Sequence, residues 1–208
     1  DVDSTFAVSA NGSVWTMAVD GTRVFIAGSF TQLGASTRLG LAALDATTGT
    51  LDAAWTPAAA GGAASVRALV VSAGTVYVGG AFATMNGVSQ ANLAAVNTTS
   101  GASLPAFTGT ADGRVSVLVV TGTSLFAGGE FFFAGGASRR GVARLSSATG
   151  LSETAFNANG NGSVSATAVS GTTLIVAGSF GLMGGQNREH IAQLDPTTGG
   201  ATAWNPGA

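Results

Sequence analysis

Residues 66–82 read VRALVVSAGTVYVGGAF, and this stretch decides the fold. Two valine-rich runs flank Ala73-Gly74, a pair of small residues that suits the positive φ angles of a tight hairpin. Both runs are apolar at nearly every position, whereas a half-exposed strand alternates apolar with polar residues. The stretch therefore predicts a β-hairpin whose strands are buried on both faces.

This stretch is one of four copies. The phrase Gly-x-Phe that ends it occurs at residues 28–30, 80–82, 129–131 and 178–180, with spacings of 52, 49 and 49 residues. A strand that begins with valine and a Thr-Gly or Ser-Gly turn recur with the same spacings. Four short strands in a repeat of about 40 to 50 residues are the signature of a β-propeller blade. We therefore expect repeats at about 14–55, 66–107, 115–156 and 164–204.

Each repeat contains four segments with strand character. In the first repeat they cover 14–19, 24–30, 41–45 and a short, irregular segment around an aromatic residue. These outer aromatics are Trp55, Phe107, Phe156 and Trp204, and Phe6 is a fifth copy. The expected fold is all-β: a β-propeller-like array of four four-stranded antiparallel blades of about 49 residues each, in a single domain over 1–208. Residues 1–13 would supply the outer strand of a preceding or closing blade.

Small residues inside the second strand of each repeat fit this arrangement. The pairs Ala27-Gly28, Gly79-Gly80, Gly128-Gly129 and Ala177-Gly178 stand mid-strand, where glycine weakens a sheet and suggests that another backbone comes close. We expect neighbouring blades, packed face to face, to make that approach. A β-solenoid or a pair of β-sandwiches is the alternative fold, but the long period and the tight hairpins favour blades.

Segments 66–82, 93–97 and 100–101 together resemble the delta-60 repeat propellers of secreted bacterial proteins and, more distantly, kelch-type blades. The resemblance covers essentially the whole chain. It implies an exported module within a longer secreted or cell-surface protein. It brings no catalytic motif, because the residues that the family repeats are structural.

The composition excludes several kinds of chemistry. The chain of 208 residues has no cysteine, its eight basic residues are all arginine, and His190 is its only histidine. Cysteine nucleophiles, thiolate metal sites, lysine Schiff bases and P-loops are therefore ruled out. A net charge of −2 with scattered arginines argues against nucleic-acid binding, and no apolar run approaches the roughly 18 residues of a membrane span. We expect no metal, no cofactor and no membrane insertion.

Two local motifs resemble catalytic or metal sites but have simpler interpretations. His190 stands where the other repeats have Gly40, Asn92 and Gly141, so we interpret it as an exposed loop residue. Residues 157–162, NANGNG, resemble a calcium loop in outline, but calcium sites prefer carboxylates to asparagine. We interpret them as a turn that joins two blades.

Arginine recurs with the period of the fold. Arg38, Arg139 and Arg188, with Gln90 in the second repeat, align between the second and third strands. In a propeller their side chains would form a partial ring on one face, where guanidinium groups suit acidic or hydroxyl-rich polymers. The alternative is that each arginine caps carbonyl groups or pairs with an acid in its own blade.

The third repeat carries four residues that its counterparts lack. Phe132 and Phe133 add two aromatics to one loop, either as an exposed contact patch or as the cover of a blade edge. Glu130 and Arg144 stand where the other repeats carry no charge. A half-buried carboxylate is unfavourable without a partner, so we expect a cross-strand ion pair between them, with a structural role.

These features favour a non-catalytic extracellular or cell-surface module for binding or scaffolding, whose partner is an extracellular polysaccharide or a surface protein. A polysaccharide-acting hydrolase or lyase is the enzymatic alternative and would need Glu130, Glu153, Glu189 or His190 around one pocket. A purely structural spacer is the third interpretation. Closing a propeller removes exposed sheet edges, so we also expect self-association that completes a larger ring.

Overall fold

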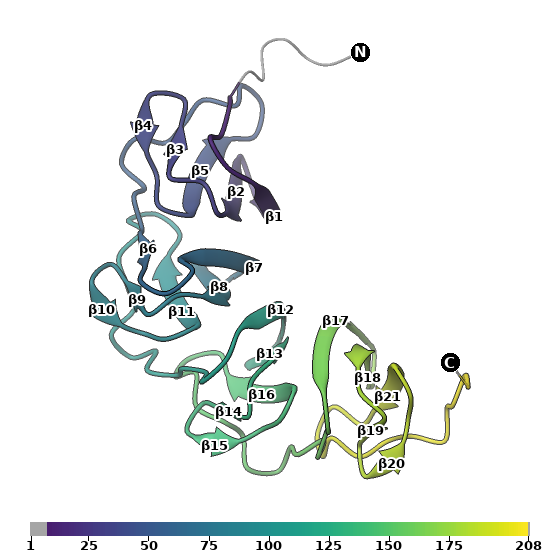
Figure 1. Cartoon of the computed structure of the whole chain (residues 1–208). Coiled ribbons are helices and arrows are strands. Elements are labelled where there is room, and N and C mark those ends of the chain that lie inside the picture. The colour runs from purple at the N-terminus through teal and green to yellow at the C-terminus, as the bar shows by residue number, and fades with distance from the viewer. Residues whose placement is uncertain (1–7, 208) are drawn as a thin grey trace. The chain divides into compact units, whose positions relative to one another are not determined.

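The computed structural model describes residues 8–207, and this range contains strands, turns and loops without a helix. The chain divides into two compact units, residues 1–104 and 105–208, and the boundary falls three residues before the expected end of the second repeat (Figure 1). The prediction of an all-β chain is confirmed.

The first unit contains two three-stranded antiparallel sheets. The first sheet is formed by β1 (Val14–Asp20), β2 (Arg23–Gly28) and β5 (Leu41–Asp45), and the second by β7 (Ser65–Ser72), β8 (Thr75–Ala81) and β11 (Leu93–Asn97). In each repeat a short hairpin lies between the second and third of these strands. The hairpins are β3 (Gln32–Leu33) with β4 (Ser36–Thr37), and β9 (Thr84–Met85) with β10 (Val88–Ser89), which β6 (Ala59–Ala60) extends.

The second unit repeats this plan. Its third sheet is formed by β12 (Val115–Thr121), β13 (Ser124–Gly129) and β16 (Val142–Ser146), and its fourth by β17 (Ser163–Ser170), β18 (Thr173–Ser179) and β21 (Ile191–Leu194). The corresponding hairpins are β14 (Phe133–Ala134) with β15 (Ala137–Ser138), and β19 (Leu182–Met183) with β20 (Gln186–Asn187).

The fourth strand of each repeat was predicted wrongly. After the turn that follows the third strand, the chain makes a single β-bridge back to that strand, at Leu51, Ser103, Ser152 and Ala201. Alanine occurs in all four segments and proline in three of them, and both have low β-propensity, so the pairing does not extend. Three strands and a bridging segment therefore replace the expected four.

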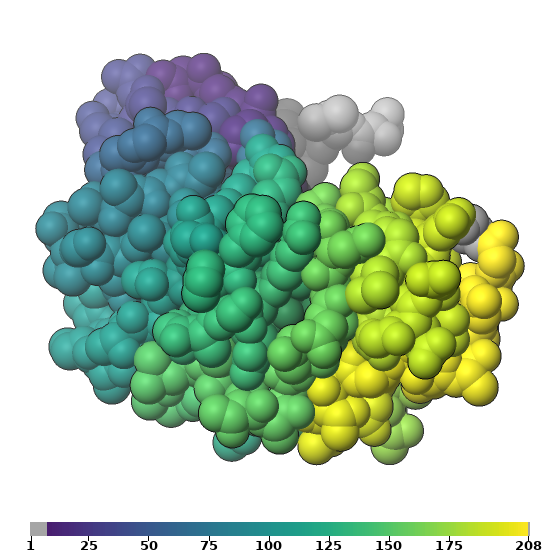
Figure 2. All heavy atoms as spheres, turned by 60° about the horizontal axis from the view of Figure 1, so that its bottom comes forward, coloured from purple at the N-terminus to yellow at the C-terminus, as the bar shows by residue number. Residues whose placement is uncertain are grey.

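The core of each unit lies between its two sheets. In the first unit Phe25 and Ala27 of β2 belong to one apolar cluster with Val76 and Val78 of β8. Trp55 is fully buried there, with its ring centroid 5.0 Å from that of Phe25. The second unit repeats the arrangement around Phe126, Phe156, Val164, Leu174 and Val176. Its two sheets abut along the boundary between green and yellow-green spheres in Figure 2.

The repeated glycine of Gly-x-Phe is explained by a bulge in the first strand. Each sheet has a register shift near the start of that strand, for example between Val164 and Ala166. At Gly178 an added Cβ would lie 2.1 Å from the main-chain oxygen of Ser163, and Gly28, Gly80 and Gly129 are hindered in the same way. The close approach is thus confirmed, but at these glycines it comes from the first strand of the same sheet and not from a neighbouring one.

The burial of some strands and outer aromatics departs from expectation, and Ala166 and Ala168 of β17 are exposed. Met17 and Val19 of β1 are each 66% exposed, so this strand is not buried on both faces. Trp204 is 40% exposed, whereas Trp55, Phe107 and Phe156 are buried. Phe6 lies outside the described residues, and of the expected outer strand at 1–13 the described part makes one bridge, Ala10 to Leu33.

Candidate functional site

The loops that join second to third strands are fixed by side-chain oxygens. Asp112 Oδ1 accepts hydrogen bonds from the main-chain N–H groups of Phe132 at 2.8 Å and Phe133 at 2.9 Å. Asn11 and Asn161 hold the corresponding loops of the first and fourth repeats in the same way. Any side chain that such a loop presents is therefore preorganised by two additional hydrogen bonds.

The predicted ring of ligand-binding arginines is wrong. Arg38, Gln90 and Arg139 are buried, and Arg188 is half-buried. The guanidinium of Arg139 donates to the carbonyl oxygens of Ser138 at 2.7 Å and Glu153 at 3.3 Å. Arg38 and Arg188 make the same two kinds of contact, to the preceding residue and to the residue 14 positions later. Because the bridging segment forms no strand, its carbonyl groups need these donors.

The predicted ion pair between Glu130 and Arg144 is also wrong. Glu130 follows the end of β13, and Arg144 lies opposite Phe126 in the register of β16. Glu130 pairs with Arg114, which precedes β12. The Nε of Arg144 lies 3.0 Å from the Glu153 carboxylate.

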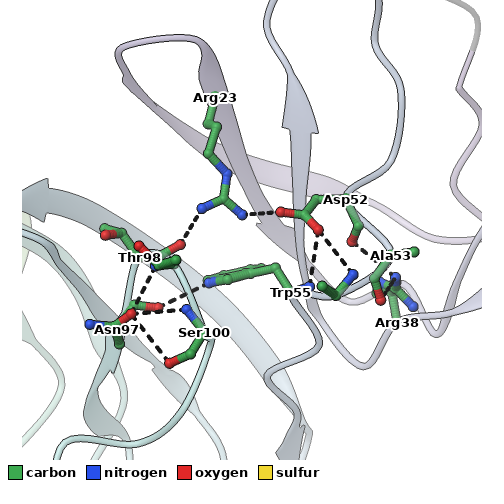
Figure 3. A network of polar contacts seen from close by, with 10 residues as sticks. Arg23, Arg38, Asp52, Ala53, Trp55, Asn97, Thr98 and Ser100 are labelled. Atoms are coloured by element: carbon green, nitrogen blue, oxygen red, sulfur yellow. Dashed lines mark hydrogen bonds and ion pairs between the residues drawn. The ribbon is translucent and has the colours of Figure 1, made fainter.

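Two arginines that form ion pairs within their own repeat also bond to the neighbouring repeat, which the sequence had not indicated. Arg23 pairs with Asp52 and also donates to the carbonyl oxygen of Thr98 in the second sheet's repeat (Figure 3). Arg144, paired with Glu153, donates to the carbonyl of Pro196 at 3.0 Å in the fourth repeat. The two acceptor carbonyls occupy equivalent positions 98 residues apart. The equivalence of the two contacts could not be seen in the aligned repeats, because Arg23 and Arg144 come from different strands.

Trp55 adds a further link within the first unit. Its indole N–H donates to the carbonyl oxygen of Asn97 at 3.0 Å, as Figure 3 shows beside the Arg23 contacts. The hydrogen bonds that Trp55 and Arg23 donate to main-chain carbonyl groups thus connect the two sheets of this unit. The polar groups of these residues are used in contacts within the unit and are not available to bind a ligand.

The remaining candidate surrounds Phe132, and we name it the Phe132 pocket. It has a volume of about 160 Å³ and is lined by Glu130, Phe131, Phe132, Arg140, Gly162 and Ser163. Phe132 is 54% exposed and Phe133 55%, so the interpretation of these rings as an exposed patch is supported over that of a buried cover. The guanidinium carbon of Arg140 lies 4.8 Å from the ring centroid of Phe132.

The surroundings of the Phe132 pocket combine apolar and polar groups. Phe131 is buried and forms a fixed wall, while the exposed ring of Phe132 is free to contact a ligand. Glu130 offers acceptors beside its partner Arg114, and Arg140 offers donors. An aromatic surface flanked by both kinds of hydrogen-bonding group suits a ligand that has apolar patches and many hydroxyl groups.

A second pocket occupies the corresponding place in the fourth repeat. It has a volume of about 450 Å³ and is lined by Asn161, Ser179, Phe180, Gly181, Glu189 and His190. His190 is exposed and adopts a φ of 64°, like the Gly40, Asn92 and Gly141 that it replaces. It is the exposed loop residue that the sequence predicted, and its Nδ1 lies 3.2 Å from the carbonyl oxygen of Gly178.

The carboxylates proposed for catalysis are distributed over separate places. Glu130 and Glu189 line different pockets, and Glu153 is held by Arg144 and by the hydroxyl of Ser124 at 3.0 Å. Among residues 8–207, no three histidine, aspartate or glutamate side chains are grouped as a metal site. No helix in that range is long and apolar enough to span a membrane.

Two aspartates with perturbed titration serve turns. The main-chain N–H groups of Thr48 and then Thr47, followed by the Thr48 hydroxyl, hold the pKa of Asp45 below its ordinary value. Asp195 has a lowered pKa for the same reason, through the N–H groups and hydroxyl of its own turn. Hydrogen bonds to the charged form stabilise that form.

The comparisons with known proteins concern the fold alone. No family model and no curated protein matches the chain. Among solved structures, the computationally designed Ika8 protein is 16% identical with a TM-score of 0.59, over 90% of this chain and 47% of that one. BamB from Moraxella catarrhalis is 16% identical with a TM-score of 0.52, over 92% of this chain and 61% of that one.

A further similar structure is the WD40 β-propeller domain of Doa1, 12% identical with a TM-score of 0.47, over 95% of this chain and 70% of that chain. The chain thus spans about half the length of Ika8 and less than two thirds of BamB. Successive antiparallel sheets pack face to face within each unit. The fold is β-propeller-like.

Proposed function

We propose that this chain is a non-catalytic binding module that recognises hydroxyl-rich polymers, polysaccharides first, through the Phe132 pocket. One observation carries the proposal: Phe132 and Phe133 are more than half exposed on a loop that the Asp112 carboxylate holds in place. An exposed apolar patch with polar residues around it marks an interaction or ligand-binding site. A loop fixed in advance loses little conformational entropy when it binds.

The chemistry of the pocket fits a sugar ring. The face of a pyranose that carries C–H bonds packs on an aromatic ring, and its hydroxyl groups accept from a guanidinium and donate to a carboxylate. Phe132, Arg140 and Glu130 supply these three functions within one pocket. The volume of about 160 Å³ is below the roughly 300 Å³ at which small-molecule sites begin, so one unit of a polymer fits the pocket better than a large free ligand.

The second pocket in the fourth repeat supports recognition of a polymer. Its lining residues Ser179, Phe180 and Gly181 correspond to Glu130, Phe131 and Phe132 at a spacing of 49 residues. Two weak subsites on one rigid scaffold raise the overall affinity for a repetitive ligand. A single short oligosaccharide is then expected to bind more weakly than the polymer.

The arrangement of the acidic side chains favours binding over turnover. Glycoside hydrolysis generally uses two carboxyl groups that flank one bond, about 5 to 9.5 Å apart. The Glu130 carboxylate is instead paired with Arg114, and the other glutamates lie elsewhere. Catalysis by Glu189 and His190 in the second pocket is the competing function, and it predicts measurable product release.

The wider setting belongs to the same proposal. We infer that the four repeats are blades of a larger propeller of the delta-60 type, in a secreted or cell-surface protein. The support is the resemblance of the repeats and the β-propeller-like fold. A surface location would bring the pocket into contact with extracellular polysaccharides.

The experiment is a binding screen of neutral and anionic polysaccharides, with product analysis on the same samples. We expect binding without new reducing ends, and at least a tenfold loss of affinity in Phe132→Ala. Leu151→Ala is the matched control, because Leu151 is 48% exposed in the same repeat but follows the turn at the opposite end of β16. Release of sugar would favour the enzyme, and absence of binding to every polymer would favour the spacer.

A further inference from the structure

The outer face of the first sheet is apolar, and its edge at β1 is largely exposed. Met17 and Val19 of β1 are each 66% exposed on this face, and their cross-strand partners Ile26 and Val24 lie on it with them. Leu44 of β5 continues the same face; Ile26 and Leu44 are buried in a small apolar cluster of this repeat, and Val24 is half-buried. We call these five residues the leading face. Met17 and Val19 thus extend a partly buried apolar face into solvent, and exposed apolar patches mark interaction sites.

The equivalent face of the second sheet indicates what the leading face contacts. Its residues Leu69, Val71, Val76, Val78 and Val96 stand 52 positions after the five residues of the leading face. All five pack in the core between the first and second sheets. In the second unit the corresponding face of the fourth sheet packs on the third sheet, through Leu174, Val176 and Leu194. In the other sheet pairs, therefore, this face receives the back of another sheet.

The fourth sheet carries the matching surface. Ala166 and Ala168 of β17 are exposed, and Ile175, Ala177 and Gln193 are half-buried. We call these residues the trailing face. Ala177 and Ile175 correspond to Ala27 and Phe25 of the first sheet, which are fully buried because the second sheet covers them. The trailing face is thus in the position of a surface that another repeat covers.

We propose that the leading face binds the trailing face of a second copy of this chain, in a head-to-tail contact. The small side chains of Ala166 and Ala168 leave room for the larger Met17 and Val19, and none of the residues of either face is charged. The contact repeats the packing that joins first to second sheet, so it needs no new geometry. Each copy carries one leading and one trailing face, and a head-to-tail contact that closes on itself leaves no face free for further growth.

The test is light scattering and sedimentation of the whole chain at micromolar concentration. We expect a species with twice the monomer mass, and a shift to monomer in Met17→Glu combined with Val19→Glu. Both side chains are largely exposed already, so the variant keeps its fold. Val88→Glu is the control, because Val88 is 53% exposed on β10 and outside both faces, and this variant stays dimeric.

A mixing experiment tests whether the contact joins the leading face to the trailing face. Ala168→Arg blocks the trailing face, so it is expected to be monomeric alone and to associate with the double glutamate variant, because that pair retains one intact contact. A wild-type chain that stays monomeric, a dimer that survives the glutamate variant, or a mixture that fails to associate would each overturn the proposal. Polysaccharide binding is a separate readout, since Phe132 lies on neither face, and its failure leaves this result unaffected.

Discussion

Replacing Gly178 with alanine tests the explanation for the repeated Gly-x-Phe phrase. The added Cβ would lie 2.1 Å from the main-chain oxygen of Ser163 and 2.9 Å from Cα of Val164, whereas ordinary contacts start at 3.4 Å. Both obstacles are backbone atoms, so no side chain can rotate away. Opening a backbone angle by about 15° would by itself cost about 4 kcal/mol. Alternatively, the strand can move away and relieve the clash. It then loses local sheet pairing and the 2.8 Å hydrogen bond from the Gly178 N–H to the His190 carbonyl, which is worth about 1 kcal/mol.

We therefore expect Gly178→Ala to lower the free energy of unfolding by about 3 to 4 kcal/mol, measured by urea unfolding followed by circular dichroism. Gly181→Ala is the matched control three residues away. Its Cβ meets its nearest neighbour, the Asn161 side chain, at 3.8 Å, so its effect stays within about 0.5 kcal/mol. Equal stability of the two variants would refute the bulge explanation.

Three other predictions concern stability. Asp45→Asn combined with Asp195→Asn reduces the loss of stability below pH 4. A carboxyl whose pKa is lowered in the folded state stabilises the fold above the ordinary value of 3.8, and this contribution disappears as the pH falls. Asn97 already closes the equivalent turn, so the variant folds, and urea unfolding at pH 3 and pH 7 is the measurement. Glu153→Gln weakens the half-buried pair with Arg144 and lowers the unfolding free energy by about 1 kcal/mol, a difference that shrinks in 1 M salt. Arg139→Met lowers the free energy of unfolding by about 1 to 2 kcal/mol, because two carbonyl groups lose their donor, while polysaccharide binding stays unchanged in a parallel assay.

Periodic features could be predicted from the sequence. The third strands begin and end where expected at Leu41–Asp45, Leu93–Asn97 and Val142–Ser146, because apolar runs between turn residues define them. The need for glycine in the second strands was also predictable from its place inside an apolar run. The identity of the backbone that comes close was not, because a bulge is a property of the paired strand.

Side-chain partners were less predictable, because they depend on register and loop direction. Glu130 was assigned to a strand, but β13 ends one residue earlier, and the carboxylate therefore meets Arg114. Arg38 and its counterparts recur with the fold, yet a recurring residue serves a structural need as readily as a ligand. The need here was the unpaired carbonyl groups of the bridging segments, which could not be known before the fourth strand proved to be a single bridge.

The most direct measurement of the proposed binding site is an NMR titration of the isotope-labelled chain with a soluble oligosaccharide from the binding screen. The account predicts that chemical-shift changes concentrate at Glu130, Phe132, Phe133 and Arg140, with a second set at Gly181 and Glu189, and that the ligand spectrum shows no cleavage over the titration. Saturating shift changes confined to other residues, or conversion of the ligand into product, would contradict it.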